Sequence, residues 1–381
     1  MKPFDVYPLI NITPVRAQGS RLWDDQGQEY IDLYGGHAVI SIGHNHQHFN
    51  QRLKDQLDKI TFYSNSVQIP IQQELASKLG ELSGYADYHL FLCNSGAEAN
   101  ENALKLASFD TGKAGFISFS GAFHGRTSGA VALTDNPKIV APFNKDHQTS
   151  ILPFGDLVAV EQRLQHGDIA GVIIEGIQGI NGIQVPEPSF LLGLATLCKQ
   201  YGSKLILDEV QSGYARTGRF FAHQWVEGLQ PDLITTAKGM GNGYPIGGVL
   251  IHPDFKASFG LLGTTFGGNH LACAAGLAVL EVIEEENLMK VAAESGDFLM
   301  DSLRHTEGVL QVRGKGLMVG VDLDREAAPV RNELIKNHHI FTGSSSGKNT
   351  IRLLPPLNIP RKDLTLFLES IQNVLTQPQY H

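Results

Sequence analysis

Short runs of apolar residues that end in polar or glycine-rich turns constrain the fold of this chain more than any other feature of its sequence. The runs are LFLC before Asn94, GFISF before Ser120, GVIIE after Ala170, KLILDEV around Asp208, DLITTAK ending at Lys238 and GGVLI ending at Ile251. Such runs are typical of strands that are buried on both faces of a sheet. Helical patterns separate several of them, over residues 97–109, 156–165 and 190–201. The alternation predicts an α/β fold with a mostly parallel sheet between layers of helices.

The pattern changes after about residue 269. We expect helices over 271–286, 291–303 and 362–375, and strands over 318–321 and 350–354. This order predicts a second, smaller α+β lobe. At 381 residues the chain has room for two domains.

The composition narrows the class of protein. The net charge of −9 argues against a nucleic-acid-binding protein, because phosphate binding needs a concentrated basic surface. Cys93, Cys198 and Cys273 are too few and too far apart for a disulfide framework. No apolar stretch is long enough to span a membrane, and Asp5 and Pro8 interrupt the start where a signal peptide would be apolar. We therefore expect a cytoplasmic protein with no nucleic-acid or membrane partner.

The segment LFLCNSGAEAN places Ser95, Gly96 and Ala97 at a turn from a strand into a helix. Exposed N–H groups at a helix start, with a hydroxyl and a glycine for close approach, form a cradle for phosphate. The same residues also fit an ordinary capping box, with Glu98 three residues after Ser95. The motif alone leaves both interpretations open.

The strand LILDE ends in two carboxylates, Asp208 and Glu209, which is the pattern of a Walker B strand in an ATPase. A Walker A loop should then lie upstream, and none does. The string from Gly343 to Asn349 is one residue short and lies downstream, and its GxSxG match around Ser345 is not followed by a helical pattern. The GxGxxG fingerprint of nicotinamide enzymes is also absent.

Three histidines, His44, His46 and His48, lie in the loop segment GHNHQH. No neighbouring acid or cysteine cluster completes a tetrahedral set of ligands, so we expect no metal site.

Lys238 ends a predicted strand immediately before a glycine-rich loop. A lysine at such a place is usually just solvated, but a Schiff-base lysine needs a rigid backbone behind it and space in front. A phosphate cradle, a strand-end carboxylate and a strand-end lysine are together the parts of a pyridoxal phosphate site. In such a site the carboxylate of Asp208 keeps the pyridine nitrogen protonated, so that the ring can act as an electron sink.

From Gly19 to about Leu375 the chain resembles the class III (ornithine/acetylornithine type) aminotransferases. The resemblance rests on LFLCNSGAEAN, AFHGRT, LDEVQSGYARTG, TTAKGMGNGYPIGG, GTTFGGNHLACAAG and IRLLPPLN, in the order and at the spacing of that family. It implies a fold-type I pyridoxal phosphate homodimer with shared active sites. It also implies a large doubly wound domain over residues 46–285, and a small domain made of residues 1–45 and 286–381.

The resemblance assigns the cofactor contacts residue by residue. Lys238 would be the Schiff-base lysine and proton shuttle. Around the ring, Asp208 would pair with the pyridine nitrogen, Gln211 would lie near the hydroxyl and Phe123 would stack on the face. Ser95, Gly96 and Ala97 would bind the phosphate, and Thr265 would contact the phosphate bound by the partner subunit.

The resemblance also assigns two arginines to the substrate. Arg126 would bind the carboxylate far from the reacting carbon, and Arg352 the α-carboxylate of glutamate or 2-oxoglutarate. The family usually covers this second arginine with a glutamate, but here that position is Ile180, so Glu175 in the same segment is a candidate to do so instead. His37 stands where relatives carry Ile or Tyr, and we expect it to contact the substrate.

These residues imply transfer of the terminal amine of N-acetylornithine or N-succinylornithine to 2-oxoglutarate, giving the semialdehyde and glutamate, in arginine biosynthesis. The alternatives are ornithine, 4-aminobutyrate or another ω-amine as donor, a non-catalytic member of the family and, from a different class, an ATPase.

Overall fold

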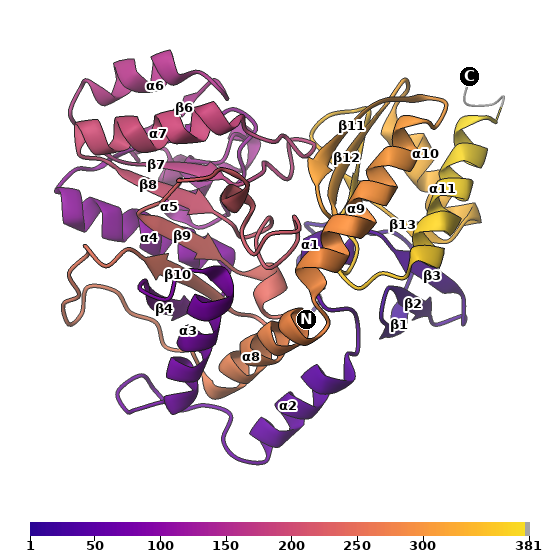
Figure 1. The fold of residues 1–381 in the computed structure, drawn as a ribbon, viewed down its shortest axis with the longest axis horizontal. Coiled ribbons are helices and arrows are strands. Elements are labelled where there is room, and N and C mark those ends of the chain that lie inside the picture. The colour runs from indigo at the N-terminus through magenta and orange to yellow at the C-terminus, as the bar shows by residue number, and fades with distance from the viewer. Residues whose placement is uncertain (378–381) are drawn as a thin grey trace.

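The computed structural model describes residues 1–377 and shows two lobes side by side (Figure 1). The larger lobe contains a seven-stranded sheet in the order β4-β10-β9-β8-β7-β5-β6. Its strands are β4 (His89–Cys93), β5 (Gly115–Phe119), β6 (Thr149–Leu152), β7 (Ile169–Glu175), β8 (Lys204–Asp208), β9 (Leu233–Thr236) and β10 (Gly247–Ile251). Only β10 runs antiparallel to its neighbours, β4 and β9. The predicted mostly parallel sheet is confirmed.

Alternate side chains of the central strands supply two separate cores, one on each face of the sheet. On β8, Leu205 and Leu207 lie in the core covered by α6 (Leu157–Leu164) and α7 (Pro188–Tyr201). Ile206 points to the opposite face, where it packs in the core that contains α4 (Gly96–Thr111). The sheet is therefore covered on both faces, as its near-continuous apolar strands require.

Three further helices complete the larger lobe. They are α3 (Pro70–Ser83), α5 (Ser128–Ala132) and α8 (His270–Glu285), and the buried residues of α3 and α8 share one core. Helix α2 (Gln47–Leu57) packs against α8 below the sheet (Figure 1).

The smaller lobe joins the two ends of the chain. Its first sheet has the order β1-β2-β3-β13, and the second has the order β11-β12-β15-β14. The strands are β1 (Pro14–Gln18), β2 (Arg21–Asp24), β3 (Glu29–Asp32), β11 (Val309–Lys315), β12 (Met318–Leu323), β13 (Ile340–Phe341), β14 (Gly343–Ser344) and β15 (Thr350–Leu353). Because β13 pairs in parallel with β3, the prediction that both chain ends build the small lobe is confirmed.

Helices α9 (Leu288–Arg304), α10 (Ala327–Asn337) and α11 (Arg361–Leu375) pack on these sheets. The predicted helices and strands after residue 269 all exist, with ends shifted by three residues at most. We propose that the domain limits lie near residues 45 and 285, as the sequence indicates.

The lobes meet where a buried arginine fixes the loop that follows β8. Arg216 is 2% exposed, and its Nη1 donates to the carbonyl of Leu317, at 3.2 Å, and to that of Pro355. The backbone N–H of Leu317 donates in return to the Arg216 carbonyl at 3.0 Å. These bonds tie the large lobe to the strands of the small lobe.

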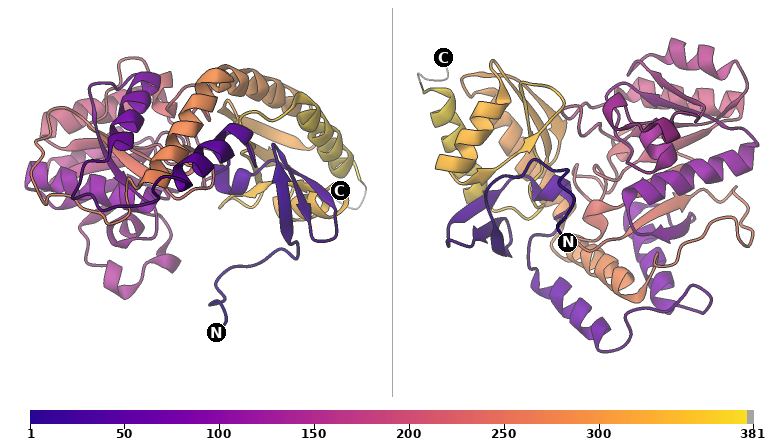
Figure 2. Two further views of the ribbon diagram at one scale, coloured as in Figure 1. Left: turned by 90° about the horizontal axis from the view of Figure 1, so that it is seen from below. Right: turned by 180° about the vertical axis from the view of Figure 1, so that it is seen from behind.

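The N-terminal residues before β1 project away from the body of the molecule (Figure 2). Phe4, Tyr7 and Leu9 in this segment are exposed apolar side chains. No helix within residues 1–377 is both long and apolar enough to cross a membrane.

Candidate active site

Five parallel strands of the large sheet end at the same edge, and each carries a predicted site residue there or just beyond. Ser95 follows β4, Phe123 follows β5, Glu175 ends β7, Asp208 ends β8 and Lys238 follows β9. The register of the strands sets Glu175 beside Asp208, and Asp208 beside Thr235. The carboxyl edge of a parallel sheet is the usual place for a ligand in an open α/β fold. The fold thus gathers residues that are far apart in the sequence.

Asp208 lies at the centre of this edge and is 4% exposed. Its Oδ2 accepts hydrogen bonds from His124 Nδ1 and Asn100 Nδ2, both at 2.8 Å, and its Oδ1 accepts from the backbone N–H of Val210 at 3.0 Å. Asn100 is itself fixed by the hydroxyl of Thr235, which donates to its Oδ1 at 2.6 Å. Three donors therefore hold one buried carboxylate in a fixed position.

Neither His124 nor Asn100 was assigned a role from the sequence. His124 stands inside the AFHGRT motif, and Asn100 lies on the inner face of α4. Only the fold shows that both point at Asp208, because they are 84 and 108 residues away from it in the chain.

Lys238 opens a short 3-10 turn directly after β9 and has a φ of 43°, in the left-handed region. Side chains rarely adopt that region, and such strain gathers at functional sites. Burial lowers the pKa of the Lys238 amine, while the charges of Asp208 and Glu175 oppose this. No hydrogen bond or ion pair engages the amine in the described part of the chain. An uncommitted amine with a lowered pKa is suited to act as a nucleophile.

The predicted cradle lies at the N-terminus of α4. Ser95 is the N-cap residue, and its Oγ accepts from the N–H of Glu98 at 3.2 Å. A Cβ at Gly96 would lie 2.5 Å from Cγ1 of Val210, so only glycine lets this turn approach the end of β8. The N–H groups of Gly96 and Ala97 bond to no protein acceptor among the described residues. Capping and anion binding are therefore compatible here.

Glu175 is buried and fixed by the backbone around it. Its carboxylate accepts from the N–H of Phe123 at 3.1 Å and from the N–H of Gly179 at 2.9 Å. Burial raises the pKa of Glu175 to about 7, and the charge of His124 opposes this shift. The negative charge of Glu175 opposes the lowering of the pKa values of Lys238 and Arg352 by burial. Both oxygens of this carboxylate already accept backbone hydrogen bonds.

Arg352, on β15, is 2% exposed and its Nε donates to the carbonyl of Ser344. Burial lowers its pKa, and no ion pair joins it to a carboxylate within the described residues. The Ile180 carbonyl accepts from the N–H of Ser346 at 2.9 Å, so position 180 lies beside the loop that holds Arg352. Among the described residues no carboxylate forms an ion pair with this arginine, and protein atoms bury it.

Tyr34 and His37 stand next to this arginine at the junction of the lobes. The backbone from Gly35 to Ala38 has positive φ throughout, which turns the chain sharply after β3. The Tyr34 hydroxyl bonds to the ring of His37, whose carbonyl accepts from Gln211 Nε2 at 3.1 Å. Partial desolvation, and then the charges of Arg352 and Lys238, lower the pKa of His37. Tyr34 was not predicted as a site residue.

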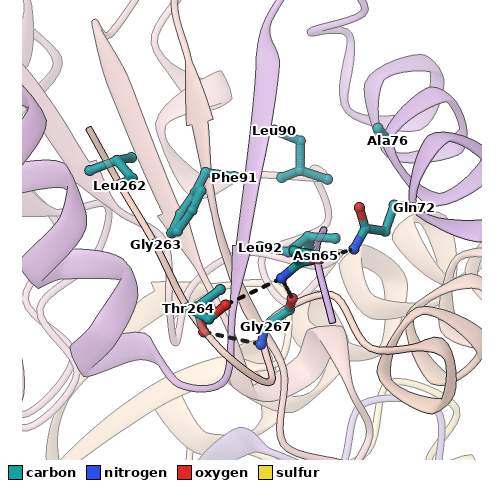
Figure 3. Close-up of a pocket in the computed structure, with 10 residues that line it drawn as sticks. All are labelled: Asn65, Gln72, Ala76, Leu90, Phe91, Leu92, Leu262, Gly263, Thr264 and Gly267. Carbon is teal, nitrogen blue, oxygen red and sulfur yellow. Dashed lines mark hydrogen bonds between the residues drawn. The ribbon is translucent and has the colours of Figure 1, made fainter. Parts of the chain in front are cut away.

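Two predicted residues face solvent instead. Arg126 and Thr265 are exposed, and Arg126 has no hydrogen-bond partner among residues 1–377. The loop of Thr265 is anchored by Asn65, whose Nδ2 donates to the carbonyls of Thr264, at 3.3 Å, and of Gly267, at 3.0 Å (Figure 3). A pocket of about 320 Å³ lies beside this loop, away from Asp208 and Lys238.

The structure also shows the surroundings of the histidine-rich segment and of the GxSxG match, to which the sequence assigned no role. His44, His46 and His48 each pair with a single carboxylate, of Asp32, Glu286 and Glu281 respectively. Residues 1–377 contain no group of three ligating side chains placed for a metal ion. The residues after Ser345 form a turn and then β15, so the helix of a nucleophile elbow is missing there.

Comparison with known proteins finds one family along nearly the whole chain. The family model described as aminotransferase class-III matches residues 5–375. An acetylornithine aminotransferase of Methanopyrus kandleri is 40% identical over 376 residues, which cover 97% of this chain and 96% of that protein.

Solved structures agree with this result. An ornithine aminotransferase from Toxoplasma gondii, which has partial occupancy of pyridoxal phosphate at its active site, matches with a TM-score of 0.90 and 27% identity, covering 98% of this chain and 92% of that one. An acetylornithine aminotransferase from Elizabethkingia anophelis matches with a TM-score of 0.84 and 30% identity, covering 98% and 96%.

The raised pKa of Glu175 predicts how stability depends on pH. Its folded-state pKa of about 7 lies above the ordinary glutamate value. At pH values between these two, the folded protein therefore keeps a proton on Glu175 that the unfolded chain has released. The contribution of Glu175 to the free energy of unfolding therefore falls as pH rises through this window, by roughly 3 kcal/mol in all. Urea unfolding at pH 4.5 to 8 should show the Glu175→Gln variant gaining stability relative to wild type as pH rises.

The exposed Glu227 supplies the control, since Glu227→Gln should follow the wild-type pH dependence. If Glu175→Gln also followed it, Glu175 would not be protonated in the folded protein at pH 5 to 6.

Proposed function

The chain belongs to the class-III aminotransferase family, and we propose that it transfers the terminal amine of N-acetylornithine or N-succinylornithine to 2-oxoglutarate. It is an aminotransferase, and its cofactor is pyridoxal phosphate. The products of the proposed reaction are the N-acylated semialdehyde and glutamate. The reaction belongs to arginine biosynthesis, and we place it in the cytoplasm, which fits three cysteines that are all buried and unpaired.

The residues at the carboxyl edge fit this cofactor. The unbonded N–H groups of Gly96 and Ala97 suit its phosphate, and Gly96 leaves room that a Cβ would fill. The carboxylate of Asp208 suits the protonated pyridine nitrogen, and the free amine of Lys238 suits the aldehyde. The observation that carries the proposal is this pairing: a buried carboxylate held by three donors, and an uncommitted lysine on the neighbouring strand.

When bound, pyridoxal phosphate supplies an aldehyde for the substrate amine and an electron-poor ring that stabilises negative charge at the reacting carbon. Asp208 would keep the proton on the ring nitrogen, and His124 and Asn100 hold its carboxylate in place. Lys238 moves the proton to and from the reacting carbon, for which its lowered pKa is suited. Phe123 would stack on the ring, and Gln211 would lie near its hydroxyl.

The two substrates differ in how they use the two arginines of the proposed pocket. Arg352 binds the carboxylate next to the reacting carbon of glutamate or 2-oxoglutarate, because a guanidinium fork matches a carboxylate. Arg126 binds the distal carboxylate, and His37 and Glu175 line the space between. The reacting carbon of an N-acylated ornithine carries two hydrogens and no carboxylate, so Arg352 has no carboxylate to bind there.

A second candidate donor is free ornithine. The similarity to the Toxoplasma gondii ornithine aminotransferase supports it, at 27% identity. The 40% identity to an acetylornithine aminotransferase over almost the same length favours the N-acylated donor.

We further propose a homodimer with shared active sites. Exposed apolar side chains gather on the N-terminal segment and on two loops whose rings of Phe62 and Phe266 lie 5.3 Å apart. Exposed apolar surface of this extent is typical of a protein interface. Thr265, exposed on the second loop, would contact the phosphate held by the partner subunit.

A panel of amine donors with 2-oxoglutarate tests the proposed reaction. We expect N-acetylornithine or N-succinylornithine to give at least about tenfold higher kcat/KM than ornithine and 4-aminobutyrate, a difference of about 1.4 kcal/mol. Lys238→Ala is the control and should lose transamination with every donor. A panel led by 4-aminobutyrate or ornithine would contradict the proposed substrate, whereas activity in Lys238→Ala would contradict the proposed site.

Sedimentation of the holoenzyme tests the shared sites. We expect a dimer at micromolar concentration, and we expect Thr265→Val to remain a dimer while it binds the cofactor about tenfold more weakly, since one hydrogen bond to phosphate is lost. A monomer with full activity would contradict the dimer. Unchanged cofactor affinity in Thr265→Val would contradict the role of Thr265.

A further inference from the structure

A second arginine stands beside Arg352 and belongs to none of the motifs that identify the family. Arg331, on α10, donates from Nη2 to the carbonyl of Thr342 at 2.9 Å. Arg352 donates from Nε to the carbonyl of Ser344. The two acceptors are two residues apart in the short segment that leads from β13 to β14. One stretch of backbone therefore positions both guanidinium groups.

Tyr34 lies across the same stretch. A Cβ at Gly343 would be 2.7 Å from Cε2 of Tyr34 and 3.2 Å from Cβ of Arg352, so the glycine lets the ring and the arginine close over the segment. The Tyr34 hydroxyl reaches His37, and burial raises its pKa, so it stays neutral at physiological pH. Arg331, Tyr34 and Arg352 thus form one cluster around this segment.

This cluster carries positive charge without a counter-ion. Neither Arg331 nor Arg352 forms an ion pair within the residues that the structure describes, and Arg331 Nε is buried with no hydrogen-bond partner there. Burial lowers the pKa of Arg352, and the nearby positive charge of Arg331 acts in the same direction. Glu175 is the carboxylate that acts on Arg352, but backbone N–H groups occupy its oxygens. A buried cation beside a half-buried one is costly unless an anion joins them.

We propose that Arg331 is a second carboxylate-recognition residue, which acts with Arg352 to select substrates that carry a carboxylate on the reacting carbon. The ligand class is an α-amino acid or a 2-oxo acid, above all a dicarboxylic one. Arg352 presents its guanidinium to that carboxylate, and Arg331 adds a second positive charge in a site of low dielectric, where the attraction is strong. An ω-amine donor has only hydrogens at this carbon and gains nothing from Arg331.

The proposal rests on the proposed transamination, in which the reacting carbon lies between Lys238 and Arg352. A purely structural alternative is that Arg331 only ties α10 to the segment at Thr342. Loss of such a tie would lower stability and affect all substrates alike. Selective recognition changes the binding of one substrate class and leaves the other unchanged.

Single-turnover measurements on the holoenzyme separate these cases, because each half-reaction can be followed alone. For Arg331→Met we expect the apparent Kd of glutamate and of 2-oxoglutarate to rise about tenfold, with the limiting rate changed less than twofold. The apparent Kd of N-acetylornithine should stay the same. Arg331→Lys restores the charge without the fork and should recover most of the glutamate affinity. The control is Lys336→Met, which removes an exposed charge from the same helix.

Calorimetry with glutarate gives a readout that needs no reaction, since this dicarboxylate has neither an amine nor a keto group. We expect Arg331→Met to weaken glutarate binding about tenfold, and Ile180→Glu to weaken it similarly by placing a carboxylate beside the loop that holds Arg352. Equal losses for glutamate and N-acetylornithine, or unchanged glutarate binding in Arg331→Met, would overturn the proposal. If N-acetylornithine proves not to be a donor, the proposed function fails, while glutarate still reports on Arg331.

Discussion

The carboxylate of Asp208 accepts hydrogen bonds from His124, Asn100 and the N–H of Val210, and these bonds connect much of the site. Asn100 belongs to α4, whose N-terminus is the proposed phosphate cradle, and Val210 packs against Gly96 of that cradle. A shift of the Asp208 carboxylate would therefore shift the cradle with it. In this way one buried charge sets the spacing between the sites proposed for the ring nitrogen and for the phosphate.

The charged side chains around Asp208 determine the electrostatics of the rest of the proposed pocket. The charges of Asp208 and Glu175 act on Lys238, and the charge of Glu175 also acts on Arg352. In our proposal, Arg331 adds positive charge beside Arg352. On the proposed function, these charges would be arranged for an anionic substrate before it enters, as preorganised electrostatics requires.

The sequence was sufficient for six strands of the large sheet, for the existence of the small lobe and for the positions of Ser95, Asp208 and Lys238, because strand ends and glycine-rich turns are local signals. It was not sufficient for His124 and Asn100, whose contacts with Asp208 cross 84 and 108 residues. Arg331 shows the same limit, since a helix position gives no sign of which pocket it borders. The edge strand β6 was also missed, because its four residues, TSIL, are half polar and only partly buried. The roles of the predicted site residues remain proposals that the residue contacts support.

The rate of transamination in Asp208→Asn tests the central role of this carboxylate most directly. The variant keeps the shape of the side chain but removes the charge that holds the proton on the ring nitrogen. We predict a folded holoenzyme with nearly unchanged Tm, whose single-turnover rate falls by at least about a thousandfold, or about 4 kcal/mol. A near-normal rate in Asp208→Asn would contradict the account.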